Sequence, residues 1–302
     1  MTIAITGGTG FVGQSLIDLA KDRGFALRSL ARKVPVGSDG VDWIAGDLRD
    51  KTALQRLAKG AQAVIHIAGQ VRAVDPAEFE ESNVKGTLNV VEAALEAGVS
   101  RFVFVSSLAA REPHLSAYGA SKKRAEKLVM ASGLDWSIVR PPAVYGPRDS
   151  EMLDMFKAAK FGVVPMPPEG RASLIHVDDL AALLAALVDP NEDATRMIFE
   201  PDDGRENGWS HRELAKAIGW AVGRRPFVPH LPRRVLKFAA RLDGLIRQSG
   251  AKLTADRVGY LMHPDWTVSK LNAVPSGIWR PAIATRAGLK STAQWYRKAG
   301  WL

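Results

Sequence analysis

The sequence contains no cysteine, and none of its apolar runs reaches the length of about 18 residues that a membrane-spanning helix needs. The absence of cysteine excludes disulfides, thiolate metal sites and cysteine nucleophiles, so any chemistry must come from other groups. No basic segment followed by an apolar one comes after Met1, and we therefore expect a cytoplasmic protein without a spanning helix. With 302 residues, 46% of them apolar, the chain is long enough for one large or two modest cores.

Acidic residues are scarce in the last quarter of the chain. Residues 224–302 hold 15 Lys and Arg against 3 Asp and Glu, a net charge of +12, whereas residues 1–223 hold 26 against 29, a net charge of −3. The overall charge of +9 therefore comes from the C-terminal part alone. Because no nucleic-acid-binding module is recognisable in the sequence, we expect no nucleic-acid partner.

Short apolar runs alternate with longer helical patterns from Thr2 to about Val139, which is the pattern of a parallel sheet built from βαβ units. The runs that predict strands are Ile3 to Thr6, Ala26 to Leu30, Ala63 to Ile67, Phe102 to Ser106 and Trp136 to Val139. Apolar residues at helical spacing cover Phe11 to Lys21, Gly86 to Ala97 and Ser116 to Ala131. The sequence therefore predicts an α/β fold, a doubly wound parallel sheet of the Rossmann type.

Proline-rich connections follow Arg140 and are interleaved with shorter helical patterns. This change predicts a smaller, discontinuous C-terminal lobe for the substrate. We assign residues 1–143 and 172–200 to a dinucleotide-binding Rossmann domain, and residues 144–171 and 201–302 to the substrate-binding lobe.

Three evenly spaced glycines, Gly7, Gly10 and Gly13, follow the first predicted strand and open the first predicted helix. In this context glycines permit a tight turn, a close approach of the backbone to a pyrophosphate and close packing of helix on strand, with the phosphates at the helix N-terminus. The sequence therefore predicts a dinucleotide site whose loop comprises Gly7, Thr9, Gly10, Phe11, Val12 and Gly13.

The end of the second predicted strand indicates which dinucleotide binds. An NAD site usually has an acidic residue about 20 residues after the glycine loop, whereas a 2′-phosphate requires cations there. This chain has Arg32 and Lys33 at that place, and the next acidic residue is Asp39. A guanidinium can stack on adenine and bind a phosphate, so we predict NADP(H) as the cofactor.

Tyr118 and Lys122 lie four residues apart in a helical pattern and therefore share one face of the helix. Ser106 and Ser107 stand at the end of the fourth predicted strand, at the edge where doubly wound sheets bind ligands. A tyrosine with a reference pKa of about 10 is a weak base at neutral pH, but a nearby cation favours its phenolate. These residues predict an acid/base site.

The motifs together resemble the extended short-chain dehydrogenase/reductase family, which includes NAD(P)-dependent epimerases and dehydratases. The similarity covers about residues 1–188 and runs in order through TGGTGFVG, AGDLRD, HIAG, NVKGTLNVVEAA, FVFVSS, YGASK, RPPAVYGP and HVDDLA.

The resemblance implies a role for each matching residue. Ser107, or alternatively Ser106, would hydrogen-bond the substrate oxygen, Tyr118 would be the general acid/base, and Lys122 would hold the nicotinamide ribose. The remaining cofactor contacts would come from Asp47 and Leu48 beside adenine, Ala68 and Gly69 in the cleft, Asn83 supporting the catalytic helix, and Pro141 and Pro142 near the carboxamide.

These roles imply an NADP-dependent enzyme that transfers hydride between the nicotinamide and a carbonyl or hydroxyl carbon. Two departures weaken a sugar-epimerase interpretation: the second strand lacks the usual acid, and the loop from Ser107 to Tyr118 is shorter than in many sugar-nucleotide epimerases. An NAD-dependent sugar-nucleotide epimerase/dehydratase remains the alternative. A non-catalytic dinucleotide-binding scaffold or sensor is the alternative from another class.

The segment from Leu231 to Arg247 forms a basic amphipathic pattern. Leu231, Val235, Phe238, Leu242 and Leu245 share one helical face, and Arg234, Lys237 and Arg241 lie away from it. Such a helix either packs its apolar face on a core or lies on an anionic membrane.

The same C-terminal region holds four tryptophans, Trp266, Trp279, Trp295 and Trp301, which could wall an apolar pocket or lie at a membrane interface. We therefore expect a hydrophobic or lipid-like ketone of the sterol, polyketide or sphingoid/ceramide kind. Peripheral association with the inner face of a membrane, and a homodimer, remain open.

Two further groups have simpler interpretations. His66, His176 and His211 match no ligand spacing, so we expect no metal. Asp178 and Asp179 are expected to cap a helix that starts near Leu180.

Overall fold

The computed structural model describes residues 1–37, 40–247 and 253–302. The chain divides into two compact units. The first comprises residues 1–141, 180–200 and 272–280, and the second comprises residues 142–179, 201–271 and 281–302. The sequence-based division has its boundaries at 143, 172 and 200, and it assigns residues 272–280 to the substrate lobe.

The first unit is built on a seven-stranded sheet with the strand order β10-β6-β5-β4-β1-β2-β3. Every neighbouring pair in it is parallel, which confirms the doubly wound fold. Its strands are β1 (Thr2–Thr6), β2 (Ala26–Ala31), β3 (Val41–Ala45), β4 (Ala63–His66), β5 (Arg101–Val105), β6 (Asp135–Val139) and β10 (Met197–Phe199). Five of these were predicted, whereas β3 and β10 were not.

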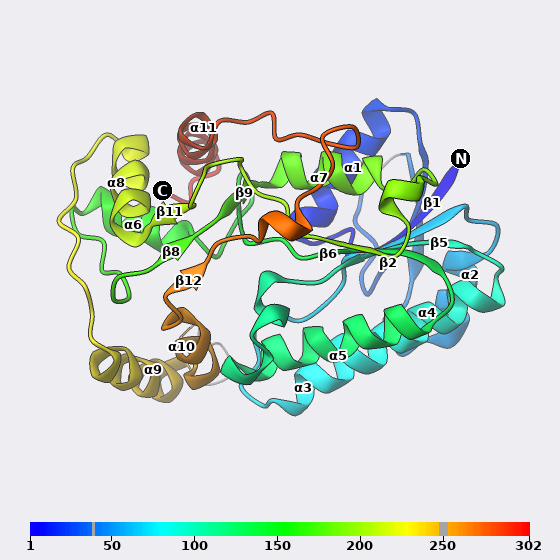
Figure 1. Cartoon of the computed structure of the whole chain (residues 1–302), viewed down its shortest axis with the longest axis horizontal. Helices are drawn as coiled ribbons and strands as arrows, with labels where there is room; N and C mark the ends of the chain where they lie inside the picture. The colour runs from blue at the N-terminus through cyan, green and yellow to red at the C-terminus, as the bar shows by residue number, and fades with distance from the viewer. Residues whose placement is uncertain (38–39, 248–252) are drawn as a thin grey trace. The chain divides into compact units, whose positions relative to one another are not determined.

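Helices cover both faces of this sheet (Figure 1). Leu54 of α2, Val90 of α4 and Val129 of α5 pack into one core with Val64 and Phe104 of the sheet. On the opposite face lie α1 and the part of α7 that belongs to this unit. The helical segments are α1 (Phe11–Asp22), α2 (Lys51–Ala58), α3 (Ala77–Phe79), η1 (Glu80–Lys85), α4 (Gly86–Glu96), η2 (Leu108–Arg111), η3 (Pro113–Leu115), α5 (Ala117–Ala131), α7 (Val177–Ala186) and η4 (Glu192–Ala194).

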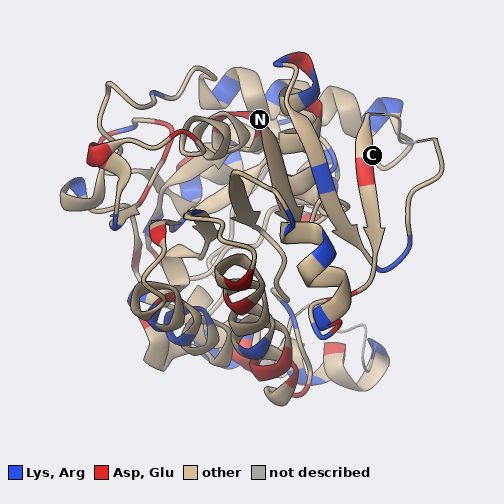
Figure 2. Cartoon of the chain, turned by 90° about the vertical axis from the view of Figure 1, so that its right-hand side faces the viewer, with Lys and Arg blue, Asp and Glu red and all other residues tan. Residues whose placement is uncertain are grey.

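Charged residues of both signs lie mainly on the helices, and the strands of the sheet carry few of them (Figure 2): Arg28 in β2, Asp42 in β3, Arg101 in β5 and Asp135 in β6. This is expected for strands that are covered on both faces, because burying an unpaired charge is costly.

The second unit has two small sheets. The first pairs β7 (Ala143–Tyr145) with β9 (Leu174–His176), and the second has the order β11-β8-β12, formed by Trp209–Ser210, Arg171–Ala172 and Asp265–Trp266. Its helical segments are α6 (Leu153–Lys160), α8 (His211–Val222), α9 (Arg233–Arg247), α10 (Ala255–Leu261), η6 (Lys270–Asn272), which extends into the first unit, and α11 (Thr285–Lys298). Phe156, Ile218, Leu289 and Tyr296 belong to its main core.

The expectation that Asp178 and Asp179 cap a helix is wrong. Helix α7 begins at Val177, so both residues lie in its first turn. The carboxylate of Asp179 instead accepts hydrogen bonds of 3.0 Å from the backbone N–H groups of Ala282 and Ile283.

The four C-terminal tryptophans do not form one wall. Trp295 and Trp301 meet edge to face at 5.0 Å, and Trp295 packs against the core of the second unit. Trp266 donates a hydrogen bond to the carbonyl of Tyr260, and Trp279 belongs to the first unit.

The apolar face of α9 differs from a core-facing one. Leu236 and Ala240 are buried, whereas Val235, Phe238, Leu242 and Leu245 are exposed. No helix among the described residues combines the length and the apolarity needed to cross a membrane.

Candidate active site

The predicted site residues of the first unit follow the carboxyl ends of its parallel strands. These ends share one edge of a parallel sheet, so the residues gather there even though they are far apart in the sequence. Gly7 follows β1, Arg32 and Lys33 follow β2, Asp47 and Leu48 follow β3, Ala68 and Gly69 follow β4, Ser106 and Ser107 follow β5, and Pro141 follows β6.

The glycine loop meets the loop after β4 next to the point where the strand order reverses. Gly7 has a φ of +81°, and a Cβ built on it would lie 2.7 Å from the backbone nitrogen of Ala68. A Cβ on Gly13 would lie 2.1 Å from the carbonyl oxygen of Gly7. Only glycine fits at these two positions, because the backbone itself fills the space.

The N-terminus of α1 fits a phosphate group. Gly10 is its N-cap, no side chain among the described residues caps it, and its first turn contains no acidic residue. The first N–H groups of the helix are therefore open to an anion, which the helix dipole also favours.

A buried chain of hydrogen bonds connects the loop after β4 to β1 and α4. Thr87 donates to the carbonyl of Asn83 at 2.6 Å, so its oxygen accepts from Nε2 of His66, 3.0 Å away. Nδ1 of His66 then accepts from the hydroxyl of Thr6 at 2.6 Å, and Thr6 Oγ1 accepts from the N–H of Ala68. Burial lowers the pKa of His66 to about 3, so the ring stays neutral and links β1, β4 and α4.

The residues after β2 and β3 differ in their surroundings. Arg32 and Lys33 are exposed, and Asp39 lies outside the described residues. Asp47 forms a 2.7 Å ion pair with Arg49, and this hydrogen bond lowers the pKa of the Asp47 carboxyl. Leu48 packs so closely on Gly86 that a Cβ there would lie 2.7 Å from its Cδ1.

Lys122 is buried in the middle of the site. Its Nζ donates a 2.9 Å hydrogen bond to the carbonyl of Val105 and lies 5.0 Å from the centre of the Phe104 ring. Burial lowers its pKa to about 8, while the charge of Glu126 acts in the opposite direction. A Cβ on Gly69, in the loop after β4, would lie 3.2 Å from Nζ and 3.0 Å from Oδ1 of Asn83, so a larger residue there would crowd both side chains.

The hydrogen bond of Lys122 joins α5, which carries Tyr118, to the end of β5, after which Ser107 follows. Tyr118 is on α5, half-buried, with its ring centre 5.8 Å from that of Phe79. Ser107 comes two residues after Val105, is half-buried, and accepts a hydrogen bond from the N–H of Ala109. The hydrogen bond from Lys122 to Val105 thus holds the Tyr118 helix at the end of the strand that leads to Ser107.

The two candidate serines have different environments. The hydroxyl of Ser106 is buried and donates to Oε1 of Glu126 at 2.7 Å. The hydroxyl of Ser106 is thus bound to a carboxylate, whereas that of Ser107 accepts from a backbone N–H.

Asn83 lies in the π-helix η1, within a helical stretch that continues from α3 into α4. Its amide donates to the carbonyl of Gln70 at 3.0 Å and to Ser121 of α5 at 2.9 Å, and its oxygen accepts from the N–H of Gln70 at 2.7 Å. Asn83 thus connects the loop after β4 to the helix that carries Tyr118.

A buried ion-pair network behind Lys122 was missed in the sequence. Glu126 is fully buried and binds Arg140 through two hydrogen bonds of 2.7 Å. Arg140 also pairs with buried Glu200, which accepts a further hydrogen bond from Asn272. The sequence feature that indicates Glu126 is its spacing, since it follows Lys122 by four residues and so lies on the helix face that carries Tyr118.

The prolines after β6 lie at the boundary of the first unit. Pro141 is buried, and its carbonyl accepts a 3.0 Å hydrogen bond from the N–H of Leu108, which joins the loops after β5 and β6. Pro142 is assigned to the second unit.

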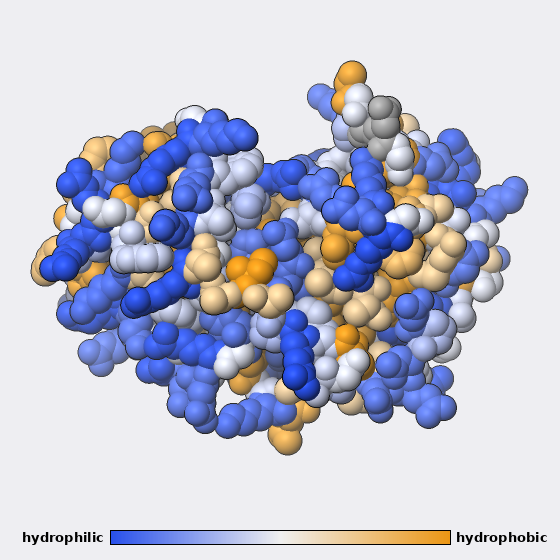
Figure 3. All heavy atoms as spheres, turned by 90° about the horizontal axis from the view of Figure 1, so that it is seen from above, coloured by the Kyte–Doolittle hydropathy of each residue, from blue (hydrophilic) through white to orange (hydrophobic). Residues whose placement is uncertain are grey.

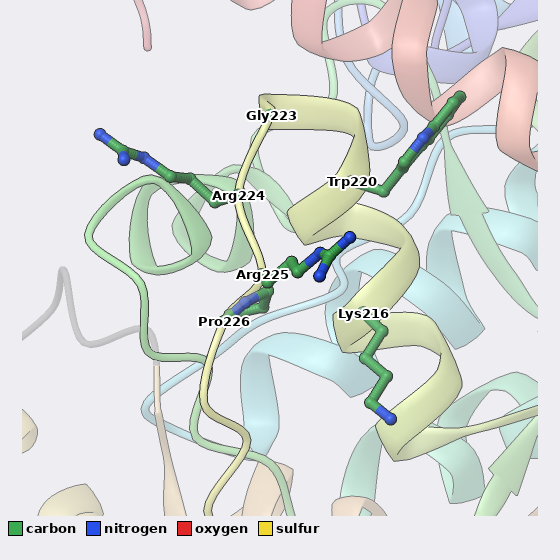
Figure 4. A pocket seen from close by; sticks show the side chains of 6 residues that line it. All are labelled: Lys216, Trp220, Gly223, Arg224, Arg225 and Pro226. Atoms are coloured by element: carbon green, nitrogen blue, oxygen red, sulfur yellow. The ribbon is translucent and has the colours of Figure 1, made fainter.

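A pocket in the second unit is lined by Lys216 and Trp220 of α8 and by residues 223–226. Figure 4 shows Arg225 lying alongside α8 and Arg224 pointing away from it. None of the residues predicted to bind cofactor or substrate lines this pocket. The candidate site therefore rests on the side chains at the sheet edge.

The sequence matches the model of the NAD dependent epimerase/dehydratase family over residues 3–199. The chain belongs to this family. The resemblance to extended short-chain dehydrogenases/reductases is thus confirmed, and the chain has the fold of an NAD(P)-dependent enzyme of the oxidoreductase or epimerase type.

Two curated relatives match almost the whole chain. Ceramide reductase of Caulobacter vibrioides is 37% identical over 312 residues, covering 99% of this chain and 96% of that protein. UDP-glucose 4-epimerase of Vibrio cholerae is 27% identical over 331 residues, with the same two coverages.

Solved epimerases share the fold. UDP-glucose 4-epimerase of Thermotoga maritima with UDP-glucose has a TM-score of 0.76 at 20% identity, covering 99% of both chains. The Thermus thermophilus UDP-glucose 4-epimerase complex with NAD has a TM-score of 0.73 at 23% identity, covering 99% of this chain and 100% of that one.

Proposed function

We propose that this protein is an NADP(H)-dependent reductase that transfers hydride between the nicotinamide and the carbonyl carbon of a hydrophobic, lipid-like ketone. The observation that carries the proposal is the position of Lys122, a buried ammonium hydrogen-bonded to the carbonyl of Val105, on the helix of Tyr118 and beside the strand end that leads to Ser107. The bound nicotinamide would supply the hydride.

Each of the three side chains would have a separate task. Lys122 uses one of its three N–H donors on Val105, which leaves two to hold ribose hydroxyls. Ser107 would donate a hydrogen bond to the substrate oxygen, and Tyr118 would give that oxygen its proton as the carbonyl becomes an alcohol. Tyr118 becomes a phenolate when it gives up this proton, and the ammonium of Lys122 would stabilise that negative charge.

The cofactor would lie along the sheet edge. The open N-terminus of α1 would bind its phosphates, and the predicted contacts at Asp47, Leu48, Ala68 and Gly69 lie after the neighbouring strands. Asn83, Pro141 and Pro142 would complete the set. The two exposed cations after β2, Arg32 and Lys33, favour a 2′-phosphate, and so NADP(H) over NAD(H).

A lipid-like substrate is supported by the relative with 37% identity over 99% of this chain, whose name is ceramide reductase. A 27% identical relative is named UDP-glucose 4-epimerase, and this favours the second candidate, an NAD-dependent sugar-nucleotide epimerase. The two differ in chemistry. A reductase exchanges its dinucleotide with solvent in every cycle, whereas an epimerase must retain it through oxidation and re-reduction.

The test is consumption of NADPH and of NADH by the purified protein with keto-sphingoid lipids, keto-steroids, aromatic ketones and UDP-sugars, combined with analysis of any retained dinucleotide. We expect NADPH oxidation with keto-lipids and no retained NAD. Interconversion of UDP-sugars by protein that keeps NAD bound would replace the proposal with the epimerase.

A further inference from the structure

Helix α9 uses only a narrow side for packing. Leu236 and Ala240 are buried and form a small cluster with Val258 of α10. Leu231, Leu253 and Met262 pack against the edge of this cluster. The two helices lie side by side at one end of the second unit (Figure 1). The larger part of the surface of α9 therefore takes no part in this cluster.

An apolar stripe runs along the exposed part of α9. Val235, Phe238, Leu242 and Leu245 follow one another at spacings of three and four residues, which places them on one face, and they are 45%, 62%, 42% and 76% exposed. Ile246 extends the stripe and is 79% exposed. On the face of the molecule seen in Figure 3, orange and tan hydrophobic residues gather mainly in the centre and right of the view, between blue hydrophilic ones. Single exposed apolar residues are ordinary, but a continuous stripe marks an interaction site.

Cationic side chains border the stripe. Arg234, Lys237 and Arg241 are exposed, and they follow one another at the same spacings of three and four residues. None of the three forms an ion pair with another described residue. The acidic residue of α9, Asp243, is paired with Arg247. The surface therefore presents an apolar strip with unneutralised positive charge beside it.

We propose that α9 docks this protein on an anionic lipid membrane, with the stripe in the interface and the three cations at the headgroups. A bilayer surface offers apolar chains and anionic groups together, and this combination matches what α9 presents. A second copy of the chain fits less well, because a symmetric contact between two α9 helices would bring the same three cations close to their counterparts. The proposal does not depend on the reaction at the sheet edge, so it is tested without turnover.

The experiment measures sedimentation of the full-length protein with vesicles. One set contains phosphatidylglycerol and phosphatidylcholine in equal amounts, and the other contains phosphatidylcholine alone. The stripe variant is Phe238→Ser with Leu242→Ser, and the charge variant is Arg234→Glu with Lys237→Glu. The matched control is Lys290→Glu with Lys298→Glu on α11, two exposed lysines whose reversal changes the net charge equally. Thermal unfolding and size-exclusion chromatography of every variant check folding and oligomeric state.

We expect the wild type to bind the anionic vesicles and to be released when salt rises from about 0.01 M to 1 M, since the Debye length then falls from about 30 Å to 3 Å. Both α9 variants should bind at least about tenfold more weakly, and the control should bind like the wild type. If the wild type does not bind anionic vesicles at low salt, the proposal is overturned, irrespective of the binding of the variants. Equal loss in the control, or a dimer that the stripe variant dissociates, would also overturn it.

Discussion

Arg140 holds the carboxylate of Glu126 with two hydrogen bonds of 2.7 Å, and both side chains are buried. The same carboxylate accepts the hydroxyl of Ser106 and lies one helical turn beyond Lys122. The carboxylate thus connects three elements directly behind the proposed acid/base site: β5, α5 and the end of β6.

Replacing Glu126 by Gln should destabilise the fold by about 3 kcal/mol, because Arg140 would lose a buried partner and keep only Glu200. Chemical denaturation followed by circular dichroism measures the change. Glu81→Gln is the matched control, since it breaks an exposed pair with Lys85 and should hardly alter the midpoint. Similar losses of unfolding free energy in the two variants would show that the buried ion pair stabilises the fold no more than the exposed one.

The stability that Lys122 confers should depend on pH. Burial lowers its pKa from 10.5 to about 8, so between these values the folded protein has released a proton that the unfolded chain still holds. The unfolded state binds more protons in this window, and stability relative to Lys122→Met should rise with pH by up to about 1.4 kcal/mol per unit. Denaturation of both proteins at several pH values from 7 to about 10.5 measures the difference. A flat difference over the window contradicts the lowered pKa.

Tyr118→Phe removes the proposed proton donor and keeps the ring that packs beside Phe79. Turnover of a keto-lipid should fall by at least about a hundredfold, the usual effect of losing a general acid. Affinity for NADPH, measured by fluorescence titration, should stay close to that of the wild type. Unchanged turnover would contradict the role of Tyr118 as proton donor, whereas a wild type that binds NADPH without any turnover would favour the scaffold or sensor class.

Arg32→Ala should weaken NADPH binding by tenfold or more while leaving NADH binding nearly unchanged. A charge-assisted contact to the 2′-phosphate contributes about 1.5–3 kcal/mol, and NADH has no such group. Calorimetric titration with both dinucleotides measures the two affinities. Arg23→Ala, which removes another exposed arginine of the first unit, serves as the control and should affect neither. Tighter binding of NADH than NADPH by the wild type would refute the cofactor preference.

Most of the main sheet could be predicted because its central strands are continuous apolar runs, such as the fully buried Arg101–Val105 with its one arginine. The strands that were missed lie at the edges. In β3 the run is interrupted by the exposed Asp42, and β10 is only three residues long. Edge strands are covered less completely, so their sequences carry a weaker apolar signal.

The candidate site was predictable where a residue type is tied to backbone geometry, as for Gly7 and Gly13. Glu126 and Arg140 were not, because charged residues are mostly exposed and only the packing of other elements shows that this pair is buried. Periodicity also gave the apolar face of α9 correctly. It could not show what that face contacts, since the contacts of a helix depend on its neighbours.

The π-helix at Glu80–Lys85 changes the direction in which side chains before and after it face along one continuous helical stretch. A π-turn holds one more residue than the α-helix would, and each residue turns an α-helix by about 100°. Asn83 can therefore face Gln70 and Ser121 while Val90, Val91 and Ala94 of α4 still face the core. Deleting a single residue here would restore regular helical winding and put one of the two faces out of phase. A change in length within this segment is therefore expected to be less tolerated than a change of side chain at its exposed positions.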